Sequence, residues 1–220
     1  MSDILFPKSF FITGTDTGVG KTLISAILMM GLSATYWKPI QSGTEESTDT
    51  DWLRQAAGLP DTYFIPEAYR LSKPLSPHAA ALIDGVRIEL STFSLPQAAK
   101  FSHLIVEGAG GVMVPINERQ YMVDLMKKLN IPVLLVARTG LGTINHTLLS
   151  LQCLRQNDLD VMGVVMNGPK NKSNCEAIEF YGGIKVVAQI DILSEITHQT
   201  LLWSFSEFSG HHKQIGKKNG

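Results

Sequence analysis

The sequence has little cysteine. Only Cys153 and Cys175 occur among its 220 residues, and they have neither the spacing of a metal site nor the number needed for a disulfide framework. A bridge between the two is open at this stage, although a pair of reduced, buried thiols is the simpler interpretation. The sequence therefore excludes a small scaffold held together by disulfides and a cysteine-based metal centre.

Charge and long apolar runs are also scarce. Charged residues make up 18% of the chain and the formal net charge is −1, which gives no reason to expect a nucleic-acid surface. No run reaches the roughly 18 apolar residues of a membrane helix. The first residues also lack the basic region and apolar core of a secretory leader. We therefore expect a cytoplasmic protein that binds neither nucleic acid nor membrane.

What the chain does contain is a regular alternation of apolar runs and helical patterns. Strands are expected at 36–40, 104–106, 132–137, 161–166 and 186–190, and helices at 22–32, 122–129 and 143–156. Most strand candidates are apolar throughout, as is typical of strands covered on both faces. The pattern predicts one α/β domain over residues 1–208, with a doubly wound, mostly parallel sheet, and a flexible tail over 209–220. The polar stretch 43–77 is expected to be a functional or mobile loop.

The clearest motif lies near the N-terminus, where an apolar run leads into Gly14-Thr15-Asp16-Thr17-Gly18-Val19-Gly20-Lys21-Thr22. Glycines let backbone N–H groups approach an anion, and the positive end of a following helix adds to the field. The motif predicts a phosphate loop in which Lys21 reaches the β- and γ-phosphates of ATP and Thr22 binds Mg²⁺. Thr15 replaces the usual first glycine, so the loop is a variant with one extra residue. A plain glycine turn beside an exposed lysine is the alternative.

An acidic and glycine-rich segment, Glu107-Gly108-Ala109-Gly110-Gly111, follows the apolar run 104–106. Ligands of parallel sheets bind outside the carboxyl ends of the strands, which places this segment beside the phosphate loop. There Glu107 can hold Mg²⁺ directly or through water. In isolation the same pattern would be a carboxylate at a sheet edge before a flexible turn.

Three further polar residues are candidates at the same edge. Lys38 follows a strand and can neutralise charge during phosphoryl transfer, although a solvated lysine is the alternative. Asp49 and Asp51 lie in the polar stretch, and either can complete a Mg²⁺ shell, which needs only one or two carboxylates. Both can equally serve a helix N-terminus.

A second glycine loop, Thr139 to His146, also opens a helix. Free N–H groups at that helix start are able to hold a carboxylate, and a plain capped helix is an equal alternative.

Together these motifs resemble those of one family, the dethiobiotin synthetases. The resemblance covers residues 9–190 and rests on GTDTGVGKT at 14–22, KPIQSG at 38–43, PLSPH at 74–78, VEGAGG at 106–111, GTINH at 142–146 and Asn167. It implies an enzyme of biotin synthesis that depends on ATP and Mg²⁺. Such an enzyme closes a cyclic urea on 7,8-diaminononanoate with CO₂ and releases ADP and phosphate.

The resemblance also implies roles for individual residues. Those implied around the diamine, its carbamate and the transferring phosphate are Thr17, Lys21, Lys38 and Ser42, the first three as catalytic residues. Those implied for Mg²⁺ are Thr22, Asp51 and Glu107, since Asp51 matches the family's position better than Asp49. Those implied for the nucleotide are Gly18, Val19, Gly20, Lys21, Thr22, Asp51, Glu107, Gly108, Ala109, Gly110, Asn167 and Gly168, with Asn167 at the adenine edge. In the family the site lies at a homodimer interface, and the other subunit brings Gly142, Thr143, Ile144 and Asn145 to the substrate carboxylate.

The sequence departs from the family at two places. Gly18 stands where some members carry an acidic residue, and the segment 189–193 lacks a proline that the family often has. The second wall of the adenine site, and with it the nucleotide selectivity, is therefore open.

Two other functions share the phosphate loop. ATP-driven dimeric switches that position partners on membranes or DNA carry a second lysine in the loop, where this chain has Asp16. A small-molecule kinase would leave the helix start at Gly142 unexplained. The ligase is therefore the preferred interpretation.

Overall fold

The computed structural model describes residues 5–45, 47–96 and 102–209. Its first half contains β1 Ser9–Gly14, α1 Lys21–Leu32, β2 Thr35–Trp37, β3 Ile40–Ser42, α2 Asp49–Ala57, η1 Asp61–Tyr63, β4 Phe64–Ile65, β5 Tyr69–Leu71, α3 Pro77–Ile83 and η2 Leu90–Thr92. Its second half contains β6 Leu104–Gly111, α4 Met122–Leu129, β7 Val133–Arg138, α5 Thr143–Gln156, β8 Val161–Asn167, α6 Lys172–Gly182, β9 Val186–Ile190, α7 His198–Phe205 and η3 Ser206–Ser209. Residues 210–220 of the expected tail lie outside the described part.

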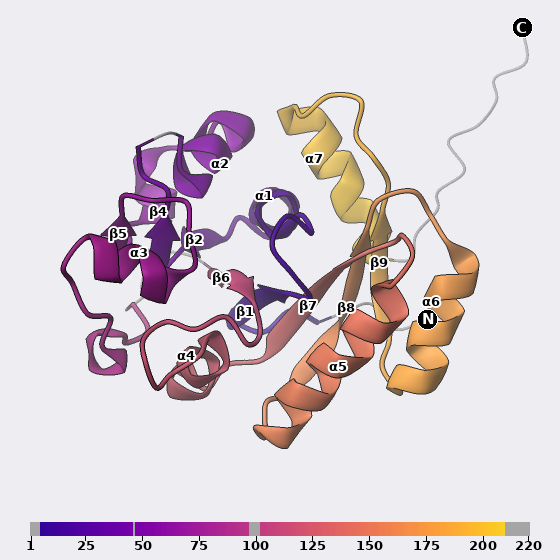
Figure 1. Ribbon diagram of the computed structural model, residues 1–220. Helices are drawn as coiled ribbons and strands as arrows, with labels where there is room; N and C mark the ends of the chain where they lie inside the picture. The colour runs from indigo at the N-terminus through magenta and orange to yellow at the C-terminus, as the bar shows by residue number, and fades with distance from the viewer. Residues whose placement is uncertain (1–4, 46, 97–101, 210–220) are drawn as a thin grey trace, which may run out of the picture.

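The centre of the fold is a seven-stranded sheet in the order β4-β2-β6-β1-β7-β8-β9, in which all strand pairs are parallel. Helices α1, α2 and α7 cover one face, and α4, α5 and α6 cover the other (Figure 1). A second, two-stranded parallel sheet pairs β3 with β5. The predicted doubly wound, mostly parallel α/β fold is thus confirmed.

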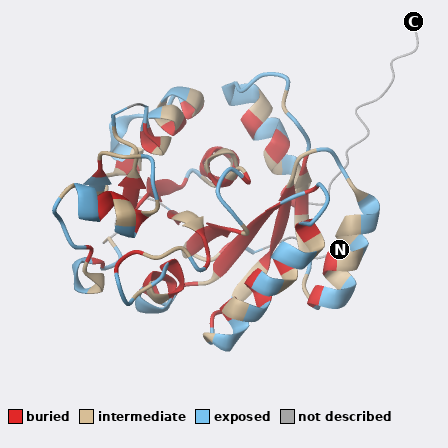
Figure 2. Ribbon diagram, in the orientation of Figure 1, coloured by how far each residue is buried: buried red, intermediate tan, exposed pale blue. Residues whose placement is uncertain are grey.

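The core has two apolar layers, one on each face of the sheet. Along β1, Phe10 and Ile12 pack into the layer under α1, whereas Phe11 packs into the opposite layer. Successive side chains of a strand point to opposite faces, so a strand covered on both sides must be apolar at every position. This explains the continuous apolar runs, and Figure 2 shows the buried strands between partly exposed helices.

Some element boundaries differ from those expected. The predicted strand 36–40 is two strands, because the chain leaves the large sheet after Trp37 and Pro39 provides no N–H for a ladder. The strand expected at 104–106 continues to Gly111, so Glu107 lies within β6 rather than behind it. The stretch 43–77 is not a single loop, since it contains α2, β4, β5 and the first residue of α3.

Two expectations from the scarce features can be compared with the structure. Cys153 and Cys175 are both free thiols, so they form no bridge. Among the described residues, no helix has the length and apolar content required to cross a membrane.

Candidate active site

A cavity of about 550 Å³ lies at the carboxyl edge of β1, β2 and β6, where ligands of parallel sheets bind. Its lining includes ten of the predicted residues: Thr17, Gly18, Gly20, Lys21, Thr22, Lys38, Ser42, Glu107, Ala109 and Gly110. The remaining lining residues are Gln41, Asp49, Pro74, Leu75, Ser76, Pro77 and Val114. Motifs far apart in the sequence therefore meet at one place.

The phosphate loop joins β1 to α1 in a conformation that needs glycine. Gly18 and Gly20 have φ angles of 73° and 96°, which side chains other than glycine rarely adopt. Gly20 precedes the first turn of α1, so the free N–H groups of that turn face the loop. Lys21 is buried, and its Nζ donates to the Asp16 carbonyl at 3.0 Å. Burial lowers the pKa of Lys21 against the opposing effect of the Glu107 carboxylate.

Glu107 is fully buried and held from behind. Its Oε2 accepts hydrogen bonds from Ser25 Oγ at 2.7 Å and Tyr36 Oη at 3.1 Å. Its Oε1 turns to the cavity and accepts from Thr22 Oγ1 at 3.0 Å. Burial and the adjacent Glu107 carboxylate raise the pKa of Tyr36 well above its ordinary value, so Tyr36 stays a hydrogen-bond donor. The carboxylate is thereby fixed in one orientation.

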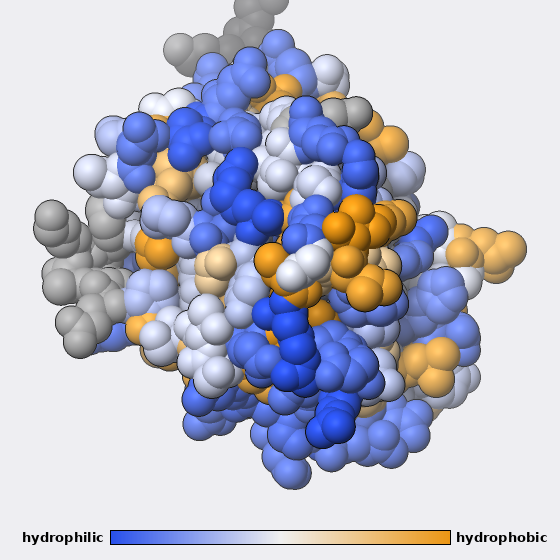
Figure 3. All heavy atoms as spheres, turned by 60° about the vertical axis from the view of Figure 1, so that its left-hand side comes forward, coloured by the Kyte–Doolittle hydropathy of each residue, from blue (hydrophilic) through white to orange (hydrophobic). Residues whose placement is uncertain are grey.

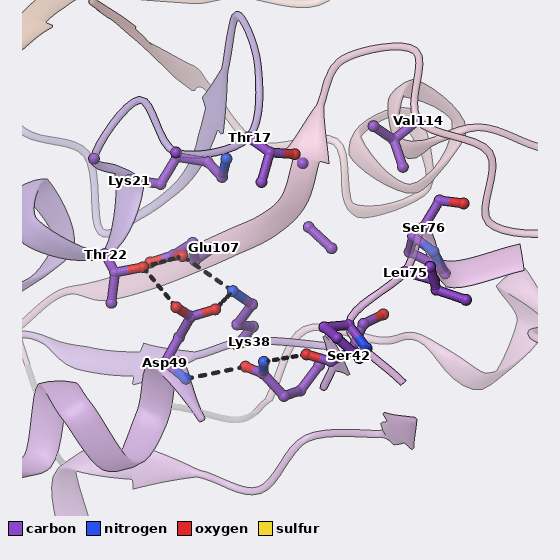
Figure 4. Close-up of a pocket in the computed structure, with 17 residues that line it drawn as sticks. Thr17, Lys21, Thr22, Lys38, Ser42, Asp49, Leu75, Ser76, Glu107 and Val114 are labelled. Carbon is purple, nitrogen blue, oxygen red and sulfur yellow. Dashed lines mark hydrogen bonds and ion pairs between the residues drawn. The ribbon is translucent and has the colours of Figure 1, made fainter. Parts of the chain in front are cut away.

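Lys38 provides the positive charge next to this carboxylate. It lies between β2 and β3, and its Nζ forms ion pairs with Asp49 Oδ2 and, at 3.2 Å, with Glu107 Oε1 (Figure 4). Burial alone would lower the pKa of Lys38, but the Glu107 and Asp49 carboxylates outweigh burial and raise it. The Lys38 ammonium therefore stays charged inside the cavity wall.

Of the two candidate aspartates, the cavity is lined by Asp49 and not by Asp51. Asp49 is the first residue of α2 and lies in the cavity, where its Oδ1 accepts from Thr22 Oγ1 at 3.1 Å. Asp51 is turned away, because its carboxylate accepts from Thr48 in a capping box and pairs with Arg54 at 2.9 Å. A capping box fixes the side chain three residues after the cap, and that geometry directs Asp51 away from the cavity.

The side-chain oxygen atoms in the cavity fit a hard cation, which prefers oxygen ligands. The Thr22 hydroxyl and the Asp49 and Glu107 carboxylates converge, which is the donor chemistry that Mg²⁺ prefers. No group of three or more His, Cys, Asp or Glu side chains suited to a metal occurs in the described ranges. A protein site with two carboxylates suits Mg²⁺, since this ion usually keeps waters and binds substrate phosphates as well.

The helix start predicted for the substrate carboxylate is not part of this cavity. Thr143 is buried and its hydroxyl donates to the Arg138 carbonyl of the same chain, whereas Gly142 and Asn145 are exposed. Within one chain these residues and Ile144 therefore do not meet the phosphate loop.

The expected adenine residues lie beside the loop, outside the cavity lining. Asn167, at the end of β8, donates from Nδ2 to the Val19 carbonyl at 3.0 Å. A Cβ at Gly20 would lie only 2.0 Å from that Nδ2. Gly168 follows and its N–H donates to the Ile190 carbonyl at 2.8 Å. Gly108 also lies outside the lining, where a Cβ would come within 2.8 Å of the Phe11 ring.

A second cavity of about 280 Å³ lies past Asn167 and Gly168, between the end of β9 and α7. Its lining residues are Lys170, Ile190, Asp191, Ile192, Leu193, Trp203, Ser204 and Glu207. Lys170 and Glu207 form an ion pair at 3.0 Å across it. The segment in which the sequence departs from the family therefore forms a wall, in which a tryptophan takes part.

Sequence reasoning assigned no role to several residues of the main cavity, although Gln41, Ser76 and Pro77 lie in motifs that carry the family resemblance. Ser76 and Pro77 lie at the start of α3, where a proline at the first helical position was a readable signal. Gln41 accepts from the Asp49 backbone N–H at 3.3 Å and so positions the N-terminus of α2. Val114 had no such signal, because only the return of the chain after β6 brings it to the cavity.

Comparison with known proteins identifies relatives of the chain. A family model described as an AAA domain matches residues 8–200. The chain is 49% identical over 194 residues to the ATP-dependent dethiobiotin synthetase BioD of Paramagnetospirillum magneticum. This match covers 88% of the chain and 93% of that protein. It is also 50% identical over 200 residues to the biotin biosynthesis bifunctional protein BioCD of Bordetella avium. That match covers 90% of this chain but 43% of the longer protein.

The fold has more distant relatives among solved structures. The MinC:MinD cell division protein complex of Aquifex aeolicus contains a chain that matches with a TM-score of 0.57 at 12% identity, covering 96% of this chain and 99% of that one. At this identity the likeness shows the fold alone. In the protein described here, the Asp16 carboxylate of the phosphate loop forms an ion pair with the Arg138 guanidinium at 2.7 Å.

Proposed function

The chain belongs to the ATP-dependent dethiobiotin synthetase family, and we propose that it closes the cyclic urea of dethiobiotin from 7,8-diaminononanoate and CO₂ at the expense of ATP. The observation that carries this proposal is the arrangement of the main cavity. Two buried lysines, Lys21 and Lys38, face it together with the phosphate loop. That arrangement suits the stabilisation of a reacting anion next to a triphosphate.

The phosphates are proposed to bind in the loop. The backbone N–H groups of residues 18–22 and the Lys21 ammonium supply the positive field, and Ala109 and Gly110 form the facing wall. To reach the phosphates, Lys21 gives up its hydrogen bond with the Asp16 carbonyl. The base is proposed to lie toward Asn167 and Gly168, with the second cavity beside Trp203 as its other wall.

The metal is proposed to be Mg²⁺, held by Thr22, Asp49 and Glu107. Asp49 takes the role expected of Asp51, for the geometric reason given above. When bound, Mg²⁺ supplies charge neutralisation to the phosphates. The protein contributes a carboxylate, Glu107, whose orientation Ser25 and Tyr36 already determine.

The reacting anion is proposed to be the carbamate formed when CO₂ combines with one amine of the diamine. Thr17, Lys38 and Ser42 line the part of the cavity that would hold it. The Ser42 hydroxyl oxygen is buried and has no hydrogen-bond partner in the described part of the chain, as expected of a group that awaits a ligand.

The reaction then proceeds in two displacements. A carbamate oxygen attacks the γ-phosphorus, the bond to the β-phosphate oxygen breaks and ADP leaves. Lys21 and Lys38 stabilise the charge of this transition state. The second amine attacks the carbonyl carbon of the carbamic-phosphoric anhydride, phosphate leaves and the ring closes. Holding both amines in one cavity makes the second step intramolecular.

We also propose that the working species is a homodimer in the cytoplasm. The cavity is open toward Leu75, whose side chain is about half exposed, and Leu82, Ile83 and Val86 of the α3 region are exposed as well. Figure 3 shows apolar surface on the face that carries α3. The exposed Gly142 and Asn145 could then reach the substrate carboxylate of a neighbouring subunit. The two free thiols fit a reducing compartment.

The test is an assay of ADP release in which each component is left out in turn. With Mg·ATP alone we expect slow ADP release, because a closed site excludes water as acceptor. Diaminononanoate and bicarbonate together should raise it by at least about tenfold and yield dethiobiotin by mass spectrometry. Full ADP release without the diamine would reject the ligase and favour an ATP-driven switch.

A further inference from the structure

The position of Lys38 points to a role in metal binding, before the reaction starts. We propose that the Lys38 ammonium and Mg²⁺ compete for the same two carboxylates, so that binding of the metal releases Lys38 toward the reacting anion. Lys38 would thus hold the two carboxylates together before the metal binds and become available to substrate only when the metal has arrived. The last step rests on the proposed function, whereas the competition itself does not.

The competition follows from which oxygen atoms are shared. Glu107 Oε1 accepts both from Lys38 Nζ at 3.2 Å and from Thr22 Oγ1 at 3.0 Å. Asp49 is divided in the same way, with Oδ2 paired to Lys38 and Oδ1 bound to Thr22 at 3.1 Å. Two of the three oxygen-bearing groups that fit Mg²⁺, the Asp49 and Glu107 carboxylates, therefore already contact the ammonium (Figure 4).

One partner in this cluster cannot move. Glu107 has no exposed surface, and Ser25 and Tyr36 hold its other oxygen at 2.7 and 3.1 Å. Lys38 sits in the connection between β2 and β3, and its four-carbon stem has several rotatable bonds. A divalent ion brought to Glu107 would therefore displace the ammonium rather than the carboxylate.

Electrostatics gives the displacement its direction. Two cations within a few ångströms repel strongly in a buried site, where screening by water is weak. The Lys38 side chain is only 6% exposed, so little solvent shields it from an arriving ion. The same cavity offers Lys38 an alternative partner when an anion binds near Thr17 and Ser42.

The change in Mg²⁺ affinity expected on substitution of Lys38 is opposite to that of most substitutions in a metal site. Most substitutions at a site weaken metal binding, but removal of Lys38 should strengthen it, because a competitor is lost. The measurement is isothermal titration of MgCl₂ into protein loaded with ADP, without diamine or bicarbonate. Lys38→Met is expected to bind Mg²⁺ at least about tenfold more tightly than the unaltered protein.

A matched control uses a lysine outside the cluster. Lys73 is exposed and pairs with Glu45 at 2.7 Å, so Lys73→Met removes the same charge without touching the two carboxylates. Its Mg²⁺ affinity should stay within about twofold of the unaltered protein. If Lys38→Met does not fold, Lys38→Gln keeps a polar, uncharged end on a slightly shorter stem and carries the same expectation.

A crystal grown with Mg·ADP supplies a readout independent of affinity. Lys38 Nζ is expected to lie beyond ion-pair distance of both carboxylates, with Glu107 still bound to Ser25 and Tyr36. Unchanged or weaker Mg²⁺ binding by both Lys38 variants, or a Lys38 still paired with Glu107 beside the bound metal, would overturn the proposal. Failure of the unaltered protein to make dethiobiotin would instead reject the proposed function, and the titration would still report on the competition.

Discussion

At the scale of single residues, the buried carboxylate of Glu107 is the group on which the site depends. Burial of a carboxylate costs several kcal/mol unless hydrogen bonds and a counter-ion replace its lost hydration. Here Ser25, Tyr36 and Thr22 donate to it and Lys38 supplies the charge. The sequence pattern identifies Glu107 and Lys38, whereas Ser25 and Tyr36 lie in apolar runs and carried no signal.

The two aspartates near the start of α2 should differ in their effect on metal use. Asp49→Asn is expected to raise the Mg²⁺ concentration for half-maximal activity about tenfold, because it removes one charged ligand of the proposed metal site. Asp51→Asn should leave that concentration unchanged and lower the free energy of unfolding by about 1 kcal/mol, since it weakens the capping box. A magnesium titration and urea denaturation of both variants check this. The reverse ranking in the magnesium titration would return the ligand role to Asp51.

The lowered pKa of Asp49 predicts part of the loss of folding stability at acid pH. Burial would raise its pKa, but Lys38 and Thr22 outweigh burial and hold it below the ordinary value of 3.8. In the window between the folded pKa and 3.8 the unfolded chain binds a proton that the native protein does not. This stability is therefore present above that window and lost as the pH falls through it.

The change from about pH 5 to about pH 3 should accordingly destabilise Asp49→Asn less than the unaltered protein. Urea denaturation at both pH values measures the difference. Equal losses in the two proteins would show that Lys38 does not hold the pKa of Asp49 down.

At the scale of elements, the contact between α1 and α7 depends on the absence of one side chain. A Cβ at Gly31 in α1 would lie 2.1 Å from the ring of Phe205 in α7. Gly→Ala inside a helix normally stabilises it by up to about 1 kcal/mol. Gly31→Ala is expected to destabilise the protein by about 1–3 kcal/mol instead, because the packed ring must move.

Chemical denaturation measures this effect, and two further variants interpret it. Gly140→Ala places a methyl group in open space at a position without a positive φ, and should change stability by less than about 0.5 kcal/mol. Phe205→Leu combined with Gly31→Ala should recover part of the loss. A stabilising Gly31→Ala would mean that α7 does not pack on α1 as described.

Elements differed in how well the sequence predicted them. The bounds expected for α4, α5 and β9 agree with the structure. A strong apolar period defines α4, the glycine loop that ends at Gly142 marks the start of α5, and a short β-branched run defines β9. Helices α3, α6 and α7 were not predicted. Only a few of their residues are buried, such as Ile178 and Leu201, so their apolar period is weak. The hydrophobic pattern of a segment predicts a helix or strand only when many side chains of that segment are buried in the core.

At the scale of the whole molecule, the proposed dimer makes a prediction about mixed subunits. If each site takes Lys38 from one subunit and Asn145 from the other, a dimer of one Lys38→Met and one Asn145→Ala subunit has one intact site. Refolding an equal mixture of the two inactive variants should then give about a quarter of the unaltered activity, because half of the dimers are mixed. Activity assays combined with sedimentation measure this. No recovery in a mixture that contains mixed dimers would place both residues in the same site of one chain, and an active monomer would reject the dimer.

The sequence predicted the type of site, but not all of the residues that line it. Glycine spacing and charged residues after strands predicted that the phosphate loop and both lysines would meet in one cavity, since the carboxyl ends of parallel strands share one edge. The choice between Asp49 and Asp51 had a signal that was not used, because Thr48 and Asp51 have the spacing of a capping box, which turns the Asp51 carboxylate toward the helix start. The wall at 74–77 is the connection from β5 to the start of α3, and no local sequence pattern predicts that this connection lies beside the cavity.

The place of β6 between β2 and β1 determines how the chain can mature on the ribosome. The first 103 residues contain both flanking strands but not the strand that joins them, so the edges of β1 and β2 that pair with Leu104–Gly111 have no partner strand in a nascent chain of that length. A nascent chain of that length also lacks Glu107, the buried carboxylate of the proposed metal site. Its exposed edges are also the kind of surface that misassembles during translation. Slowing of elongation around residue 100, or loss of a holdase chaperone, should therefore reduce the soluble yield without altering the activity of the molecules that fold.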